Sequence, residues 1–312
     1  MTANESIGIQ VSNLTKNYGK LTAVDQVSFD VRKGEIFGFL GPNGAGKTTT
    51  ARIITGVLKA DKGEALVMGY EAGTLKAKQI AGVVPETANA YEDLSGWKNM
   101  DLMGKIYGVP KNIIKDRSEE LLKKVNLYSR KDELVRTYSK GMKQRLILCM
   151  ALISDPEILF LDEPTAGLDV QSSRMIKDFL LEFNSDGKTI FLTTHQMEEA
   201  NQLCDKIAII DQGVIVKIGS PERIRTEIKG MHSVEVSFEG AVNHHFFNSL
   251  SEVKSLKKKG DKYKLYTEKP GDTVVSLAKH ASARNLEIVS LNVLSPSLED
   301  AFLSLTRREK KS

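Results

Sequence analysis

A glycine-rich segment that ends in a lysine and consecutive threonines is the first part of the sequence able to do chemistry. It consists of Gly41, Pro42, Asn43, Gly44, Ala45, Gly46, Lys47, Thr48 and Thr49. The segment fits the pattern G-x-x-x-x-G-K-[ST], in which inward-pointing backbone N–H groups and the start of a helix surround a phosphate. Lys47 can then reach β- and γ-phosphate oxygens, and Thr48 can ligate Mg²⁺. We expect a nucleoside triphosphate site here, the alternative being a glycine-rich turn that fits by chance.

Two adjacent carboxylates form the second element. Asp162 and Glu163 directly follow the apolar stretch Ile158–Leu161. A buried strand delivers such residues at its carboxyl end, where open α/β sheets bind ligands, and neighbouring strand residues point to opposite sides. We therefore assign Asp162 to the Mg²⁺ and Glu163 to the attacking water as general base. Taken alone, Glu163 could equally be a helix cap or a surface charge.

A hydroxyl and a glycine at the start of a long apolar helix form the third element. The segment "YSKGMKQR" spans Tyr138–Arg145, and Ser139 lies 23 residues before Asp162. The Ser139 hydroxyl and the Gly141 N–H could bind a second anion at this helix N-terminus. The plain alternative is an ordinary serine N-cap.

In this order, the three elements resemble the ATP-binding cassette (ABC) proteins, whose signature sequence is usually written LSGGQ. The resemblance is strong over residues 1 to about 225, and it implies ATP and Mg²⁺ as cofactors. It also implies that Tyr18 stacks on adenine, that Asp169 ends the D-loop, and that His195 contacts the γ-phosphate. Tyr18 could otherwise be a packing residue, and His195 a core histidine.

Two positions depart from the family pattern. Glu86 stands where the family usually has a glutamine that senses Mg²⁺ and water and connects to the membrane subunit. Its carboxylate can still accept from water or bind the metal, so we keep Glu86 in both the nucleotide and metal sites. The segment Lys140–Met142 replaces the usual second glycine and glutamine of the signature, but the donors at Ser139 and Gly141 remain.

Within the family, the segments "VPETANAYEDLSGWKNM", "TAGLDV" and "SPSLEDAFLSLT" resemble ATPase subunits of bacterial exporters of drugs, antibiotics, lipids, polysaccharides or sodium. This resemblance implies a second ATPase subunit, expected to be another copy of the chain, whose signature completes each ATP site. It also implies a multi-span membrane permease that docks around residues 91–107, and a location at the cytoplasmic face of the cell membrane. The transported substrate would be chosen by the permease.

Short apolar stretches alternate with amphipathic helices along the first two thirds of the chain. The stretches "EIFGFL", "QIAGVVP", "EILFLDEP", "TIFLTTH" and "KIAIIDQG" predict buried strands of a mostly parallel sheet. Alternation before residue 33 predicts antiparallel strands, and residues 87–153 predict an inserted helical subdomain. We expect an α/β P-loop NTPase fold over residues 1–228. Residues 229–312 alternate strand and helix patterns and predict a small α+β appendage, with the order βαββαβα.

The composition is that of a globular chain. It has 312 residues, a net charge of +4, 41% hydrophobic and 27% charged residues. That charge is too weak to indicate nucleic acid as a partner, and none is expected. Two isolated cysteines indicate a reducing compartment. We see no secretory signal, and the longest apolar run is far too short for a membrane span.

Two other classes compete with the transporter assignment. A non-transport ABC ATPase of translation or chromosome type would carry two cassettes or long heptad arms, whereas this chain has one P-loop and no heptad run. A P-loop GTPase or kinase would lack the signature and the histidine. Cell fractionation would distinguish a transporter subunit from a non-transport ABC ATPase, because only the transporter subunit should follow the membrane fraction when its membrane partner is present.

Overall fold

The computed structural model describes residues 6–86, 89–226, 232–240, 242–294 and 296–308. The chain divides into two compact units, Met1–Pro221 and Glu222–Ser312. The boundary expected after residue 228 falls outside the described residues. Among the described residues, no helix is both long and apolar enough to cross a bilayer.

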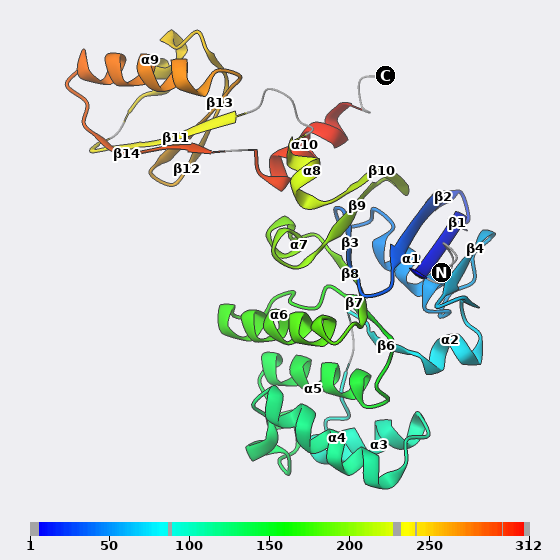
Figure 1. Cartoon of the computed structure of the whole chain (residues 1–312). Coiled ribbons are helices and arrows are strands. Elements are labelled where there is room, and N and C mark those ends of the chain that lie inside the picture. The colour runs from blue at the N-terminus through cyan, green and yellow to red at the C-terminus, as the bar shows by residue number, and fades with distance from the viewer. Residues whose placement is uncertain (1–5, 87–88, 227–231, 241, 295, 309–312) are drawn as a thin grey trace. The chain divides into compact units, whose positions relative to one another are not determined.

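A six-stranded sheet with the order β10-β9-β3-β8-β7-β6 forms the centre of the first unit (Figure 1). The strands are β3 (Ile36–Leu40), β6 (Ala81–Val84), β7 (Ile158–Asp162), β8 (Thr189–Thr194), β9 (Lys206–Asp211) and β10 (Val214–Gly219). Neighbouring strands are parallel except β10, which pairs antiparallel with β9. Every residue of β3, β7 and β8 is buried, because layers cover both faces of the sheet.

A second, antiparallel sheet with the order β2-β1-β4-β5 packs on this centre. Its strands are β1 (Ile7–Tyr18), β2 (Leu21–Arg32), β4 (Lys62–Val67) and β5 (Tyr70–Glu71). Phe29 of β2 joins the sheets, since its ring centroid lies 5.3 Å from that of Phe37 on β3 and 6.0 Å from that of Phe191 on β8. The predicted α/β fold with an antiparallel β subdomain is therefore confirmed.

Helices surround the central sheet and form the inserted segment. Those near the sheet are α1 (Lys47–Ile54), α2 (Leu75–Gln79), α6 (Val170–Ser185) and α7 (Met197–Leu203). The inserted segment holds α3 (Gly96–Ile106), α4 (Lys111–Lys124), α5 (Lys140–Leu152) and the short 3₁₀ turns η2 (Tyr128–Arg130) and η3 (Val135–Thr137). Among the described α-helices of the first unit, α2, α3, α5 and α6 begin with a side-chain cap; the capping residues are Thr74, Ser95, Ser139 and Asp169.

The start of α3 is tied down by a buried amide. Asn99 is fully buried, accepts a hydrogen bond from the Tyr91 N–H at 2.8 Å, and donates to the carbonyls of Tyr91 and Ser95 at 3.0 Å. Trp97, the one tryptophan of the chain, lies half-buried beside it. The segment from Tyr91 to α3 is thus held as one structured surface.

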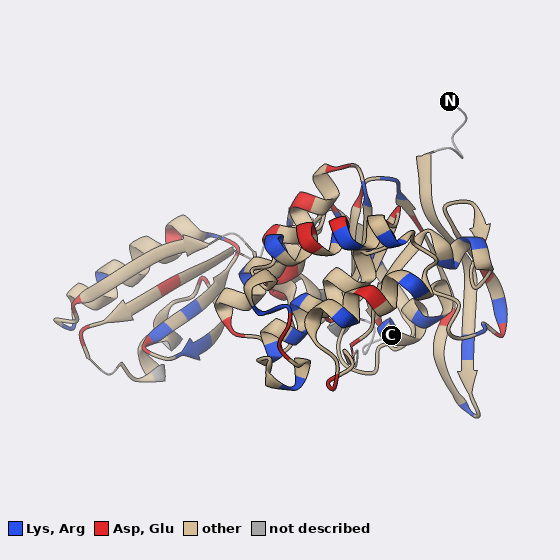
Figure 2. Ribbon diagram, turned by 90° about the horizontal axis from the view of Figure 1, so that it is seen from below, with Lys and Arg blue, Asp and Glu red and all other residues tan. Residues whose placement is uncertain are grey.

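The second unit is built on an antiparallel sheet with the order β12-β13-β11-β14. Its elements are α8 (Pro221–Thr226), β11 (His232–Phe238), η4 (His244–Ser249), β12 (Val253–Lys259), β13 (Lys262–Thr267), α9 (Pro270–Ser282), β14 (Ile288–Leu294) and α10 (Leu298–Arg308). The predicted α+β appendage is confirmed, although the helix expected between β11 and β12 is the 3₁₀ turn η4. Lysines stand out along β12 and β13, whereas both signs of charge alternate on the helices of the first unit (Figure 2).

Candidate functional site

Three parallel strands bring the predicted catalytic segments to one edge of the central sheet. β8 pairs with β3 on one side and with β7 on the other, all in the same direction. The glycine-rich segment follows β3, Glu163 follows β7, and His195 follows β8. Because the carboxyl ends of parallel strands meet at one edge, these segments become neighbours.

The glycine-rich segment closes on itself around Lys47. This side chain is buried, and its Nζ donates to the carbonyls of Gly41 at 2.8 Å and Pro42 at 3.2 Å. Gly46 precedes α1 with a φ of 106°, and a Cβ there would lie 2.5 Å from the Ala23 carbonyl, so only glycine fits. No side chain caps α1, which leaves its first N–H groups available to an anion.

Oxygen donors suited to Mg²⁺ converge at Asp162. Its Oδ1 accepts a hydrogen bond from the Thr193 hydroxyl and lies 3.4 Å from the Thr48 hydroxyl. A carboxylate and a hydroxyl are ligands that Mg²⁺ takes beside phosphate oxygens and water. The residues present therefore fit the metal that the sequence predicts, and Thr48 and Asp162 stay its expected protein ligands.

Glu163 lies between a cation and an imidazole. Its Oε1 is 3.5 Å from Lys47 Nζ, and its Oε2 is 2.9 Å from His195 Nδ1. The side chain is buried and its backbone is left-handed, with a φ of 52°, which is uncommon for a residue that has a Cβ. A hydrogen bond of 3.0 Å from its N–H to the Thr193 carbonyl holds this conformation. The carboxylate is thus fixed at the edge where a nucleotide on α1 would end.

The signature segment has an exposed hydroxyl and a tightly packed glycine. Ser139 caps α5 by accepting from the Met142 N–H at 3.2 Å. A Cβ on Gly141 would lie 2.2 Å from Ser172 Oγ, so this glycine is needed for packing against α6. Among the described residues, no hydrogen bond joins Ser139 or Gly141 to the P-loop. Within one chain the structure does not bring the two anion-binding segments together.

Asp169 is placed by α6, which it caps. Its carboxylate accepts from the Ser172 N–H at 2.8 Å and from the Ser172 hydroxyl at 2.7 Å. These hydrogen bonds, the backbone one first, hold the pKa of Asp169 below its usual range. The same serine therefore contacts Asp169 and leaves room only for a glycine at Gly141.

Within the described residues, no hydrogen bond or ion pair joins Tyr18 or Glu86 to the Asp162–Glu163 cluster. Tyr18 ends β1 with about half of its surface exposed, and Lys16 Nζ lies 6.0 Å from its ring centroid. Glu86 is exposed and follows β6, the neighbour of β7. The roles of both residues stay predictions.

Further residues that the sequence did not single out contact the site. Thr193 donates to Asp162, and the Thr165 hydroxyl donates to the buried carboxyl of Glu199 at 2.7 Å. Lys140 donates to the Ala166 carbonyl at 2.9 Å. Only Thr193 could have been picked out from the sequence, because it lies in "TTH" just before the histidine. Lys140 and Glu199 are residue types that usually lie on the surface.

The fold and the site define a P-loop ATPase of the cassette type. Two family models match the chain: "ABC transporter" over residues 24–166, and "ATP-binding protein DrrA1-3-like, C-terminal domain" over residues 219–306. The first covers the P-loop, the signature and the Asp162–Glu163 pair. The second covers most of the appendage.

Whole-chain relatives agree with both models. The linearmycin resistance ATP-binding protein LnrL of Bacillus subtilis (strain 168) is 39% identical over 96% of this chain and 98% of its own length. Nod factor export ATP-binding protein I of Ralstonia nicotianae is 36% identical over 97% of this chain and 95% of its own length. A solved dimeric cassette in a post-hydrolysis state with ADP and Pi is 25% identical, with a TM-score of 0.62, over 68% of this chain and 98% of its own.

The chain belongs to the family of ABC transporter ATP-binding proteins. It is an ATP-binding and ATP-hydrolysing subunit, with Mg²⁺ as the usual partner of ATP, and it is of the type of the export proteins named above. Subunits of this family dimerise and work with membrane permeases. The predicted transporter ATPase is therefore confirmed over the non-transport alternative.

Proposed function

We propose that this chain hydrolyses ATP at a site shared by two copies and thereby drives export through a separate permease at the cytoplasmic face of the cell membrane. The observation that carries the proposal is Glu163, held between Lys47 and His195 beside Asp162. The names of the relatives, linearmycin resistance and Nod factor export, support the direction of transport.

Each residue of the cluster has one role in this proposal. When bound, ATP supplies the γ-phosphoryl group that is transferred to water. Glu163 takes the proton of that water, and His195 keeps the carboxylate in position. Lys47 and the N–H groups that begin α1 would stabilise negative charge on phosphate oxygens, while Thr48 and Asp162 would hold Mg²⁺.

A second copy is needed because the signature does not reach its own P-loop. Ser139 is exposed at the start of α5, so it can meet the nucleotide of the partner. ATP would then join the two copies, and its hydrolysis would release them, which is a population shift driven by differential contacts. The surface from Tyr91 to α3 would receive the permease, and the dimer's opening and closing would alternate the access of the transport path.

The test is Glu163→Gln, which keeps the shape of the side chain and removes the base. We expect ATP binding to persist, hydrolysis to slow by about 10²–10⁴-fold, and a dimer to accumulate with ATP and Mg²⁺ in size-exclusion chromatography. Glu157→Gln, at the opposite end of the same strand, is the matched control and should behave like the wild type. A variant that stays monomeric with saturating ATP would contradict the shared site.

A further inference from the structure

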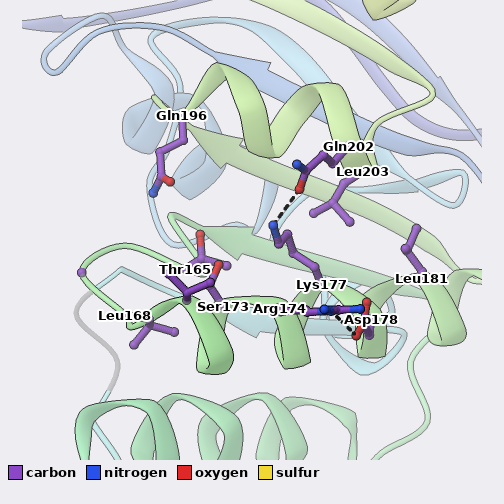
Figure 3. Close-up of a pocket in the computed structure, with 12 residues that line it drawn as sticks. Thr165, Leu168, Ser173, Arg174, Lys177, Asp178, Leu181, Gln196, Gln202 and Leu203 are labelled. Atoms are coloured by element: carbon purple, nitrogen blue, oxygen red, sulfur yellow. Dashed lines mark hydrogen bonds and ion pairs between the residues drawn. The ribbon is translucent and has the colours of Figure 1, made fainter. Parts of the chain in front are cut away.

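The loop of residues 164–169 leads from Glu163 to α6; Thr165 is buried, whereas Gly167 and Asp169 are exposed. Thr165, Gly167 and Leu168 line a pocket of about 590 Å³ whose other side includes Gln196 and Gln202 of the segment at α7 (Figure 3). Since open space rather than packed core lies against this side, the position of the loop depends on its hydrogen bonds.

Lys140 provides one of these hydrogen bonds from the signature segment. Its Nζ donates to the Ala166 carbonyl at 2.9 Å, across 26 residues of chain. The next residue, Gly167, has a φ of 66°, and a Cβ there would lie 2.4 Å from the same Nζ. The loop therefore has a shape that leaves room for the Lys140 amine.

A second attachment comes from the opposite side. The Thr165 hydroxyl donates to Glu199 Oε1 at 2.7 Å, and Glu199 is buried in α7, which begins two residues after His195. Successive residues, Thr165 and Ala166, are thus bound to two different helices. The loop connects the signature helix α5 with the segment that carries His195.

The backbone of Glu163 makes these attachments important. A left-handed backbone is unfavourable for a residue that has a Cβ, and it persists only where its surroundings hold it. The Glu163 N–H donates to the Thr193 carbonyl, and the Glu163 carbonyl accepts a hydrogen bond from the Ala166 N–H at 3.2 Å. Ala166 therefore contacts Lys140 through its carbonyl and Glu163 through its N–H.

We propose that Lys140 is a positioning residue that sets the geometry of Glu163 through Ala166. The inference rests on the proposed function, because Lys140 directly follows Ser139, the residue expected to meet the partner's nucleotide. When the signature segment of one chain binds the partner's nucleotide, Lys140 can therefore change the position of the loop that holds the general base of the same chain.

The test compares Lys140→Met with Lys140→Arg in the full chain. Methionine keeps the unbranched side chain as far as Cε but lacks the amine and cannot donate, so we expect kcat for ATP hydrolysis to fall about tenfold with KM within about twofold. Arginine can still donate to the Ala166 carbonyl and should largely restore kcat. Lys143→Met, one turn along the same helix, removes an amine that pairs with Glu92 and should leave kcat unchanged.

Unchanged kcat in Lys140→Met would overturn the proposal. A raised KM would overturn it too, because it would mean that the amine binds nucleotide directly. A wild-type chain that does not hydrolyse ATP would instead count against the proposed function.

Discussion

Replacement of Glu199 tests whether a buried carboxyl beside the site is held in its neutral form. Glu199 is 4% exposed, accepts from Thr165, and its other oxygen has no hydrogen-bond partner among the described residues. Burial, chiefly, raises the pKa of Glu199 above its usual value of 4.5, against the hydrogen bond from Thr165. The charge of Glu163 raises it further, and that of Lys177 lowers it.

The sign of the pH effect follows from linkage. Because the pKa is higher in the folded state, the contribution of Glu199 to stability is full below pH 4.5 and is lost as pH rises through the folded pKa. Glu199→Gln imitates the neutral acid and does not titrate. The variant should therefore gain stability over the wild type as pH rises from 4.5. Glu199→Ala leaves the Thr165 hydroxyl without its acceptor and should be about 1–3 kcal/mol less stable than the wild type near pH 4.5, with a smaller difference at higher pH.

Urea unfolding of the nucleotide-free protein at several values between pH 5 and pH 8 measures both effects. Trp97 fluorescence follows the first unit, and the difference between wild type and variant cancels the titration of other groups. A Gln-minus-wild-type difference that is flat, or that falls with rising pH, would show that the reasoning about burial is wrong.

Two further predictions concern other parts of the chain. Burial opposes the charge of Asp300, but hydrogen bonds from Lys264, Ser297 and Tyr266 outweigh it and lower its pKa to about 2. Stability from Asp300, about 2 kcal/mol, should be present above pH 3.8 and disappear towards pH 2, so hydrogen exchange of β13 should accelerate there in the wild type and less in Asp300→Asn. Asn99→Ala should leave the Tyr91 backbone groups without partners and cost about 1–3 kcal/mol in urea unfolding. The variant should also bind more weakly to membranes that contain the permease. Normal binding by Asn99→Ala would show that this segment does not dock the permease.

The central strands were predictable because burial on both faces leaves a plain signal. The stretches at 36–40, 158–162 and 206–211 are apolar and match β3, β7 and β9 closely. β10 was not predicted, since each of its residues is only partly buried and no alternation marks it. The turn before β10 has Gln212 and Gly213 at positive φ, as in a two-residue hairpin. The glycine at this point of the sequence is the sign of a hairpin that could have been used.

The residues of the candidate site could be predicted from the sequence, but which of them contact one another could not. The order β3-β8-β7 decides that Glu163 meets both Lys47 and His195, and this order cannot be read from one strand at a time. Glu199 resembles a solvent-exposed charge on an amphipathic helix, yet it is buried. Lys140 looks like a departure from the signature pattern until its contact with Ala166 is seen.

The single tryptophan of the chain has a practical consequence. Trp97 is half-buried at the start of α3, and its backbone N–H donates to the Lys131 carbonyl at 2.8 Å. Indole emission therefore arises from one place only, with no background from the nucleotide site or the appendage. The molecule carries its own fluorescent reporter at the surface expected to dock the permease, and docking could be titrated without attaching a dye.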